Sequence, residues 1–462
     1  MISLIIRTYN EEKWIGQCLR TVQKQEVDQE TEVILVDNQS TDKTVEKATH
    51  VYPELTLVEI SDYMPGWALN EGIRASGGEY IVCLSAHCIP VDDQWLQTLV
   101  DNFDHEANVA GVYGRQVPVE ASDPVDKRDL IRTFGLERRL QDRDTFFHNA
   151  NSVLRREVWE EYPFKEDVPN IEDQIWGNEV IDAGYTLVYE PDAAVYHHHG
   201  INQGNDRGRT KSVVRTMENN EIQPEDKLSQ DLHGNPLDPE ELDIVAVVPV
   251  RHHGNSVVDL NESLVRRTID AAAESTYIDD IVLSTDTEAV ADRASEWGAK
   301  APFLRPDELS AKDVPVIEVF KYSLKQLEAS DRYPDLVVPL EVTHPFRPRG
   351  MLDGLIEQLV REGHDSVVAS FPEFRPCWLQ SEDGELDRIN EDTQFRADRD
   401  PVQIGLTSLG CVTYPDQIRR GRRTAEDTGI YEVENPIATI EIRSSDDLEH
   451  WERLKDVSSI IP

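Results

Sequence analysis

Polar side chains that could bind a nucleotide follow the first two apolar runs of the chain. Thr8, Tyr9 and Asn10 come directly after the run that begins at Ser3, and Asp37 ends the second run, EVILVD. An amphipathic segment separates the two runs, which is the pattern of two parallel strands joined by a crossover helix. Ligands of open parallel sheets bind beyond the carboxyl ends of the strands, so we expect these four side chains to meet at one edge. A carboxylate there can accept a hydrogen bond from a ribose hydroxyl or a base N–H, which predicts a nucleotide-binding protein.

A carboxylate pair, a single histidine and a histidine triplet are the other residues that could do chemistry. Glu172 and Asp173 are adjacent, and a carboxylate in such a pair can act as a general base. Taken alone, such a pair is more often the acidic start of a helix, because carboxylates favour the positive end of the helix dipole. His87 follows one apolar run, and a triplet of histidines at 197–199 follows another. Imidazoles can ligate a divalent ion, but they are equally ordinary polar residues of a surface or loop.

The apolar runs predict a mixed α/β fold with mainly parallel sheets in both halves of the chain. In the first half we expect strands at Ile2–Ile6, Val33–Val36, Leu55–Ile60, Tyr80–Leu84 and Val109–Tyr113. Helices are expected there at Glu12–Lys24, Lys43–Thr49, Gly66–Ala75 and Gln94–Phe103. The second half alternates in the same way, through Ile244–Val248, Leu264–Ser275, Ile281–Ser284, Glu288–Trp297, Val316–Ala329, Leu336–Pro339, Gly350–Glu362 and Ser366–Ser370.

The length of 462 residues exceeds that of one ordinary domain, and two or three domains are expected. Residues 221–241 are polar and acidic, carry three prolines and show no apolar period, which is typical of a linker. The run DIVAVVPVR then begins a new buried strand. We therefore predict a first domain at 1–205, a linker region at 206–241 and a second domain at 242–462.

The formal charge of −43 is far from that of an ordinary protein. It argues against binding nucleic acid or an anionic membrane through a general basic face. An acidic surface adapted to high salt is the preferred explanation, since molar salt shortens the Debye length to about 3 Å. The five cysteines show no paired spacing, and no apolar run approaches the length of about 18 residues that spans a bilayer. Because the chain also begins directly on a strand, we expect a soluble cytoplasmic protein without a signal peptide or membrane span.

Residues 2 to about 200 resemble a family 2 glycosyltransferase with the GT-A, Rossmann-like fold. The resemblance rests on TYNEE at 8–12, VDNQSTDKT at 36–44, GWALNEGIRASGGEYIVCLSA at 66–86 and EDQIW at 172–176. It implies transfer of a sugar from a nucleoside diphosphate sugar, usually with inversion at the anomeric carbon. It also implies that Asp173, with Glu172, belongs to the catalytic site, Asp173 being the base. The residues that it implies for the donor are Thr8, Tyr9, Asn10, Asp37, Gly66 and Asn70.

The sequence departs from this family at the metal motif. The family has Asp-x-Asp after the fourth strand, where two carboxylates hold a divalent ion that bridges the diphosphate. This chain has Ser85-Ala86-His87 instead. We expect His87 and one of the terminal histidines, with His198 as the first choice, to hold Mn²⁺ or Mg²⁺. Transfer without a metal, with backbone amides and arginines holding the diphosphate, is the alternative.

Residues 243–450 resemble the acylneuraminate cytidylyltransferase family. The matches are VVPVR at 247–251, STDTEAVADRASEWGAKAPFLRPDEL at 284–309 and VTHPFR at 342–347. The resemblance implies a nucleotidyltransferase-like α/β fold, with Arg251 and Asn261 retained at the nucleotide site. The glycines and lysines of the family's phosphate loop are replaced, and Glu441-Ile442-Arg443 stands where the family has a metal-binding Asp-Ile-Asp. A triphosphate needs cationic and N–H partners, so we expect this domain to be degenerate.

These observations favour a glycosyltransferase that adds a single sugar, a hexose, to a glycan or lipid-phosphate-linked acceptor in surface-glycan or glycoprotein synthesis. One alternative is a bifunctional enzyme that also activates a nonulosonic acid as its CMP derivative. Another is a non-catalytic scaffold that binds sugar nucleotides. The expected partners are the nucleoside diphosphate sugar and the acceptor, with no nucleic acid. Peripheral contact with the inner face of the membrane and self-association are left open.

Overall fold

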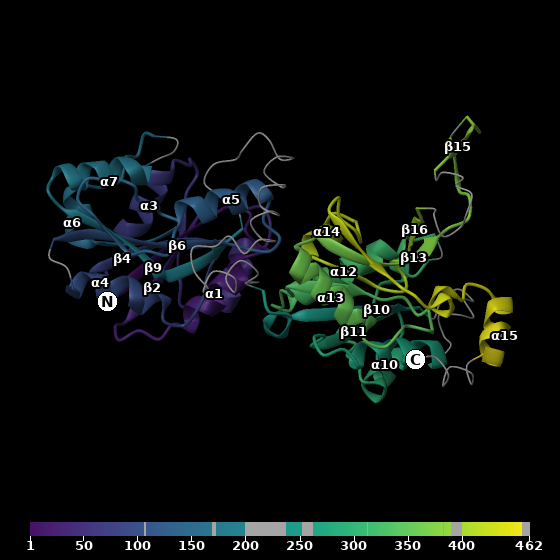
Figure 1. Ribbon diagram of the computed structural model, residues 1–462. Coiled ribbons are helices and arrows are strands. Elements are labelled where there is room, and N and C mark those ends of the chain that lie inside the picture. The colour runs from purple at the N-terminus through teal and green to yellow at the C-terminus, as the bar shows by residue number, and fades with distance from the viewer. Residues whose placement is uncertain are drawn as a thin grey trace. The chain divides into compact units, whose positions relative to one another are not determined.

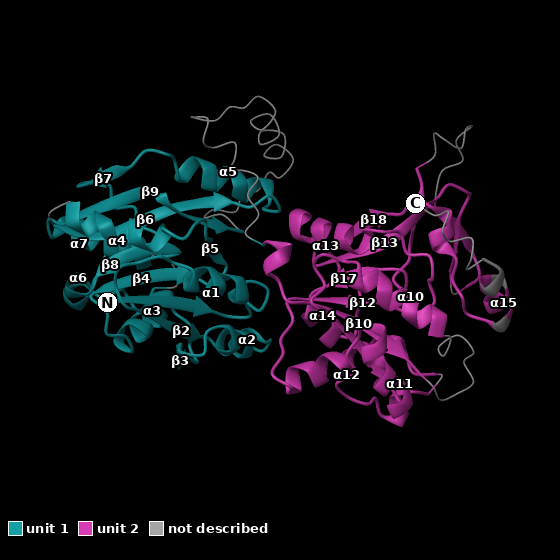
Figure 2. Ribbon diagram, turned by 90° about the horizontal axis from the view of Figure 1, so that it is seen from below, with its two compact units in different colours: residues 1–237 teal, residues 238–462 magenta. Residues whose placement is uncertain are grey.

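The computed structural model describes residues 1–105, 108–168, 172–198, 237–251, 262–311, 313–381, 383–389 and 400–454. The chain divides into two compact units, residues 1–237 and 238–462 (Figure 2). Residues 206–236 of the predicted linker lie outside the described residues, and Pro239–Glu241 form a single 3-10 turn, η1.

The first unit is built on a mixed sheet, which has nine strands in the part of the chain that the structure describes. Its order is β3-β2-β1-β4-β8-β6-β9-β5, with β7 beside β9. β1 pairs in parallel with both β2 and β4, and β6 pairs in parallel with β9, whereas β8 joins β4 and β6 in the antiparallel sense. The strands are β1 Ile2–Thr8, β2 Thr31–Asp37, β3 Thr56–Glu59, β4 Tyr80–Ser85, β5 Cys88–Pro90, β6 Val109–Pro118, β7 Arg139–Gln141, β8 Asn151–Arg155 and β9 Thr186–His197.

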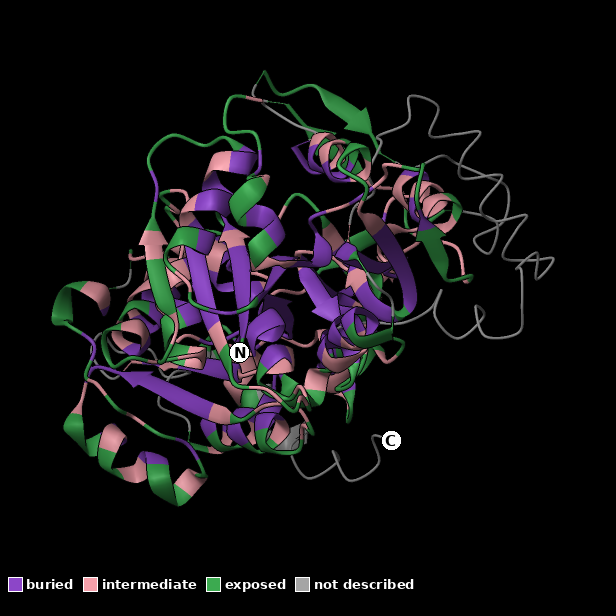
Figure 3. Ribbon diagram, turned by 90° about the vertical axis from the view of Figure 1, so that its left-hand side faces the viewer, coloured by how far each residue is buried: buried purple, intermediate pink, exposed green. Residues whose placement is uncertain are grey.

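Helices cover both faces of this sheet (Figure 1). They are α1 Ile15–Gln23, α2 Thr44–Val51, α3 Pro65–Arg74, α4 Trp95–His105, α5 Pro124–Thr133, α6 Arg156–Glu161 and α7 Glu172–Asp182. Alternate residues of β1 pack into two hydrophobic cores on opposite faces of the sheet, because successive side chains of a strand point to opposite faces. Leu4 and Ile6 pack in one core with α1, α2 and α4, and Ile5 packs in the other with α3, α5, α6 and α7. The sheet is therefore the most buried layer of the unit, as Figure 3 shows in purple.

The second unit contains another mixed sheet, of seven strands among its described residues, in the order β11-β10-β12-β17-β13-β16 with β18 beside β13. A separate two-stranded hairpin, β14–β15, carries the exposed side chains of Trp378, Leu379 and Leu386. The strands are β10 Ile244–Val250, β11 Asp280–Thr285, β12 Leu336–Pro339, β13 Ser366–Glu373, β14 Trp378–Gln380, β15 Leu386–Arg388, β16 Val402–Gly405, β17 Cys411–Thr413 and β18 Thr428–Glu432. The helices are α10 Glu262–Ala273, α11 Glu288–Ala294, α12 Val316–Ala329, α13 Met351–Glu362, α14 Pro415–Arg419 and α15 Ser445–Leu454, with 3-10 turns η2 Ser295–Trp297, η3 Asp307–Leu309 and η5 Pro436–Thr439.

The predicted α/β class is confirmed in both units, with parallel strands at the centre of each sheet. The five strands predicted in the first half are β1 to β4 and β6, and the four predicted helices are α1 to α4. The antiparallel strands β5, β7 and β8 were not predicted, nor was β9. No helix in the described part of the chain combines the length and apolar character that crossing a bilayer requires.

Candidate active site

The carboxyl ends of β1 and β2 bring the predicted donor-binding residues together. Thr8 and Asp37 are direct partners in the parallel register of these strands, and both are buried. The Thr8 hydroxyl has no hydrogen-bond partner among the described residues. The Asp37 carboxylate accepts from the Ser40 backbone N–H at 2.9 Å and from the Ser40 hydroxyl at 2.5 Å. A carboxylate has about four acceptor positions, so Asp37 retains capacity for a ligand hydroxyl or N–H.

Tyr9 and Asn10 form the loop that follows β1. The Tyr9 side chain is exposed, as expected for a residue that could cover a bound base. Asn10 adopts a left-handed backbone with φ of 55°, which asparagine tolerates better than most residues. The Asn10 side-chain oxygen accepts a hydrogen bond from the Thr41 backbone N–H at 2.8 Å, and the Asn10 backbone N–H donates one to the Ser40 hydroxyl at 2.9 Å. Asn10 therefore ties the loop after β1 to the loop after β2.

Gly66 and Asn70, the other two predicted donor-binding residues, make close contacts within the first unit. A Cβ on Gly66 would lie 2.0 Å from the Lys165 carbonyl oxygen, so this glycine permits the close approach of two backbones. Asn70 is fully buried, and its amide donates to the Phe164 carbonyl and accepts from the Trp159 indole N–H. These contacts position α3, and those of Asn70 engage both ends of its side-chain amide.

Asp173 lies in the first turn of α7, where the helix dipole and two backbone N–H groups favour a carboxylate. The Asn149 N–H donates to its Oδ2 at 3.1 Å and the Gln174 N–H to its Oδ1 at 2.8 Å. Burial nevertheless raises the pKa of Asp173, because it outweighs the hydrogen bonds that lower it. A carboxylate with a raised pKa is a stronger base, which suits the removal of a proton from an acceptor hydroxyl.

Glu172 connects α7 to the donor edge, the carboxyl ends of β1 and β2, through an ion pair that was not predicted from the sequence. Its Oε1 lies 3.3 Å from Nη1 of Arg7, the residue before Thr8 on β1, and both side chains are largely buried. The same Arg7 nitrogen donates to the Pro65 carbonyl at the start of α3. Arg7 is the one charged residue of β1, and its place at the end of a mainly apolar run was the available signal.

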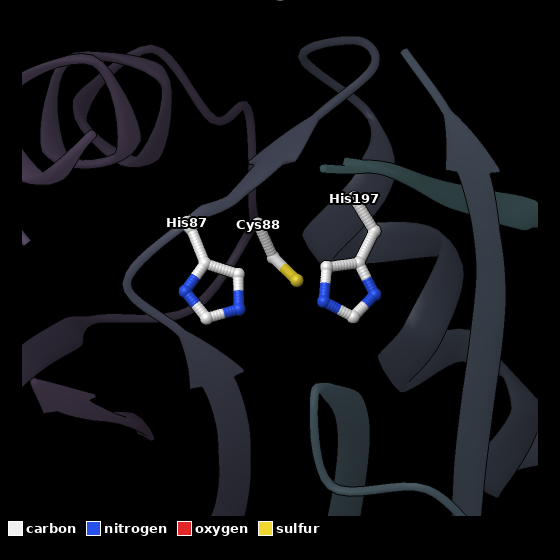
Figure 4. A group of neighbouring side chains, drawn as sticks. All are labelled: His87, Cys88 and His197. Atoms are coloured by element: carbon white, nitrogen blue, oxygen red, sulfur yellow. The ribbon is translucent and has the colours of Figure 1, made fainter. Parts of the chain in front are cut away.

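A second group of side chains lies where β4 turns into β5, next to the end of β9. Candidate ligand atoms of His87, Cys88 and His197 all lie within 4.8 Å of one another. The two imidazole centroids are 5.2 Å apart with 13° between the ring planes. In Figure 4 each ring turns one nitrogen toward the other ring, and the Cys88 sulfur lies between them. Burial raises the pKa of the Cys88 thiol well above its ordinary value.

The structure brings His197, rather than the expected His198, next to His87. Side chains alternate along a strand, and the buried His197 is the last residue of β9. The His198 ring lies 5.4 Å from the ring of Trp14. His199 lies outside the described residues. Sequence reasoning also did not identify Cys88 as a member of this group.

The second unit places Arg251 directly after β10. Arg251 lines a cavity of about 170 Å³ together with Arg305, Glu341 and Thr343. Asn261, the other predicted residue, lies outside the described residues. Glu441 forms an ion pair with Arg443 at 2.7 Å, so the carboxylate at the expected metal motif has a cation beside it.

Comparison with known proteins matches each unit to a different family. Residues 3–162 match the model described as glycosyl transferase family 2, and residues 260–378 match the model described as cytidylyltransferase. The first unit therefore contains a family 2 glycosyltransferase domain and the second a cytidylyltransferase-family domain, as the two resemblances implied.

Three curated proteins illustrate this division. A CMP-N,N'-diacetyllegionaminic acid synthase of Legionella pneumophila is 28% identical over 169 residues, which are 34% of this chain and 73% of that protein. The O-antigen chain rhamnosyltransferase WbaN of Salmonella anatum is 27% identical over 210 residues, 43% of this chain and 66% of that protein. A dolichyl N-acetyl-alpha-D-glucosaminyl phosphate 3-beta-D-2,3-diacetamido-2,3-dideoxy-beta-D-glucuronosyltransferase of Methanococcus voltae is 31% identical over 123 residues, 24% of this chain and 38% of that protein. The chain thus spans less than two thirds of the length of either transferase.

Proposed function

We propose that the first unit transfers one sugar, a hexose, from a nucleoside diphosphate sugar to a glycan or lipid-phosphate-linked acceptor, with inversion. The family 2 match supports the reaction class. The relatives named for an O-antigen chain and for a dolichyl-linked sugar support an acceptor from surface-glycan or glycoprotein synthesis. The single observation that carries the proposal is the joining of the donor edge to the acidic pair. Arg7 precedes Thr8 on β1 and pairs with Glu172, the neighbour of Asp173.

The residues of the donor edge and of α7 have different roles in the proposed reaction. Asp37 and the unpartnered Thr8 hydroxyl bind the nucleoside, and Tyr9 covers it. Asp173 takes the proton from the acceptor hydroxyl as its oxygen forms a bond to the anomeric carbon. The bond from that carbon to the phosphate oxygen breaks, and the nucleoside diphosphate leaves with the electron pair. Glu172 acts through Arg7, which fixes α7 against the end of β1.

A divalent ion fits the group of His87, Cys88 and His197, because candidate ligand atoms of these three residues all lie within 4.8 Å of one another (Figure 4). Mn²⁺ and Mg²⁺ were the ions expected from the family resemblance. The ion would supply positive charge for the leaving diphosphate. Transfer without an ion is the alternative, and removal of metal by a chelator distinguishes the two.

We place the reaction in the cytoplasm of an organism with a salt-rich interior. The charge of −43 supports the high-salt setting, and the five cysteines, all free, support a reducing compartment. Activity that rises with potassium chloride into the molar range is the expected outcome.

The proposal is tested with a panel of nucleoside diphosphate sugars and lipid-phosphate-linked acceptors in molar salt. Nucleotide release and the mass of the product are measured. One donor should yield a product heavier by one sugar. Asp37→Asn should raise the donor KM about 10- to 150-fold, since a hydrogen bond to a charged group contributes about 1.5–3 kcal/mol. Asp28→Asn, at an exposed aspartate just before β2 and therefore at the opposite end of that strand from Asp37, is the matched control. Absence of transfer across the panel, or an unchanged KM for Asp37→Asn, would refute the proposal.

Formation of a CMP-linked nonulosonic acid by the second unit is the second candidate function. It is favoured by the cytidylyltransferase match and by Arg251 beside a cavity at the end of β10. The Glu441–Arg443 ion pair opposes it, because a cation occupies a position that the family uses for metal binding. Pyrophosphate release from CTP is measured with the full chain and a panel of nonulosonic acids. Release that Arg251→Ala abolishes and the exposed control Arg349→Ala retains supports this function. No release supports the degenerate interpretation.

A further inference from the structure

The group formed by His87, Cys88 and His197 is built by strand pairing rather than by chance contact of surface side chains. β5 and β9 are antiparallel partners, and Cys88 stands directly opposite His197 in their register. His87 precedes Cys88 in the turn that leaves β4. Cys88 and His197 are buried, and His87 is half-buried. Two of the three potential ligands are thus held opposite each other by strand pairing, and the third lies in the turn directly before one of these strands.

The hydrogen bond to Glu11 fixes the proton of His87. Its Nδ1 lies 2.8 Å from Glu11 Oε1. An ionised carboxylate can only accept a hydrogen bond, so Nδ1 carries the hydrogen. In the neutral ring the lone pair then lies on Nε2, which is the nitrogen that faces His197 in Figure 4.

A longer chain of hydrogen bonds fixes the proton of His197 in the same way. The Ala150 backbone N–H, which can only donate, lies 3.3 Å from His148 Nδ1 and makes that nitrogen an acceptor. Gln116 must therefore turn its NH₂ group to the same nitrogen, at 3.0 Å. Its carbonyl oxygen is left facing His197 Nδ1 at 2.6 Å, so that nitrogen is a donor. The lone pair of His197 consequently lies on Nε2, facing His87.

Two imidazole nitrogens and a sulfur atom thus lie within 4.8 Å of one another, and a cation among them would be bound by all three. Ligating histidines typically donate their other N–H to a carboxylate or a carbonyl oxygen, and both rings here do so. The donors also select the ion, because thiolate and imidazole prefer borderline-soft transition ions whereas Mg²⁺ prefers oxygen. We propose that His87, Cys88 and His197 form a site for a Zn²⁺-class ion rather than for Mg²⁺, with Cys88 as the thiolate ligand. This inference deepens the proposed function, on which any role of the ion in sugar transfer rests.

The charges of such a site balance. The Cys88 thiol releases its proton to solvent when it binds the ion, so the ion and thiolate together carry one positive charge. The Glu11 carboxylate, hydrogen-bonded to His87, supplies the compensating negative charge. Three protein ligands leave one position of a tetrahedral ion for another group, which is the pattern of catalytic rather than structural zinc sites.

The test uses Co²⁺, which replaces Zn²⁺ and is visible spectroscopically. The full chain is treated with a chelator, dialysed and titrated with cobalt chloride. We expect one Co²⁺ per chain, visible bands of a tetrahedral ion and a near-ultraviolet charge-transfer band from a cobalt–thiolate bond. Zn²⁺ should displace the Co²⁺, and a thousandfold excess of Mg²⁺ should not. No binding of Co²⁺, or displacement by Mg²⁺, would overturn the inference.

Variants show whether these three residues are the ligands. Cys88→Ser should abolish the charge-transfer band, and Cys83→Ser, at another buried thiol of the same unit, should retain it. His197→Gln should weaken Co²⁺ binding at least about tenfold, and circular dichroism checks that each variant is folded. A charge-transfer band that survives in folded Cys88→Ser excludes Cys88 as the thiolate. Sugar transfer is not a readout here, so a chain that binds Co²⁺ without transferring sugar refutes the proposed function alone.

Discussion

Replacing Asp173 with asparagine separates the catalytic role of this carboxylate from its structural role. The substitution retains the shape of the side chain and one oxygen, which can still accept a hydrogen bond from Asn149 or from Gln174. It removes the basic group, and the amide NH₂ cannot accept a proton from the acceptor hydroxyl. Asp182→Asn, at the exposed C-terminal end of the same helix, is the matched control.

The expected loss of activity is large and the expected loss of stability small. A general base contributes about 10²- to 10⁴-fold to a rate, so kcat should fall by that factor, or about 2.7–5.4 kcal/mol in activation free energy. Losing one of the two hydrogen bonds from backbone N–H groups costs about 1–3 kcal/mol of folding free energy. The variant also no longer buries the charge whose desolvation raises the pKa of Asp173, which offsets part of this cost.

The raised pKa gives activity and stability opposite dependences on pH. The base must be ionised, so kcat of the wild type should rise as the pH passes through the folded pKa of Asp173, above the ordinary value for aspartate. In the same interval the folded state binds the proton more tightly than the unfolded state, so this group lowers stability as the pH rises. Asp173→Asn should lack the contribution of Asp173 to both dependences.

The assay is steady-state nucleotide release across the acid range, together with urea unfolding followed by tryptophan fluorescence. Undiminished transfer by Asp173→Asn would remove Asp173 from the role of base. A wild-type acid limb at or below the ordinary aspartate value would contradict the burial argument.

Three further substitutions test close packing and buried polar groups in the two units. Gly66→Ala should destabilise the first unit by about 1–3 kcal/mol in urea unfolding and lower kcat, because the new Cβ would lie 2.0 Å from the Lys165 carbonyl oxygen. The control is Gly135→Ala, which has open space around it and should change the free energy of unfolding by less than about 0.5 kcal/mol. Asn151→Ala should lower the free energy of unfolding by about 3–5 kcal/mol. The buried Asn151 amide donates hydrogen bonds to two carbonyl oxygens and accepts one from an indole N–H, and all three are lost in the variant. A urea midpoint equal to that of the wild type would contradict this. Burial lowers the pKa of His344 to about 4. The second unit should therefore lose about 3 kcal/mol of stability as the pH falls from about 6.5 to 4, because the unfolded state binds the proton first. In acid unfolding curves, His344→Gln should flatten this dependence.

Local patterns were sufficient for the parallel half of the first sheet. β1, β2 and β4 are apolar runs that end in polar residues, and β12 and α12 have the predicted bounds. β9 was not predicted because Pro191 and Asp192 interrupt its apolar run, which is the usual signal of a turn. The structure accommodates them by a register shift opposite Gly114 and Gln116, so the strand continues to His197. Knowledge of that strand would have distinguished His197 from His198 by alternation alone.

The candidate site was predictable where a motif supplies the chemistry and not where a distant partner does. Thr8 and Asp37 meet because parallel strands share one edge, which the sequence pattern already implies. The pairing of Arg7 with Glu172 joins residues 165 positions apart, and no local pattern specifies it. Asn70 illustrates the converse, since a polar residue in a motif can satisfy buried backbone groups instead of a ligand.

The place of β9 at the end of the first unit has a consequence for how the site forms during folding. β9 pairs with β5, β6 and β7, so it completes the sheet on the side that carries the histidine group. Contacts between residues far apart in sequence form slowly, because closing a long loop costs chain entropy before the contact stabilises it. The nucleoside edge rests on the short β1–β2 connection and can form early. A nascent chain therefore acquires the nucleotide half of its site well before His197 arrives to complete the other half.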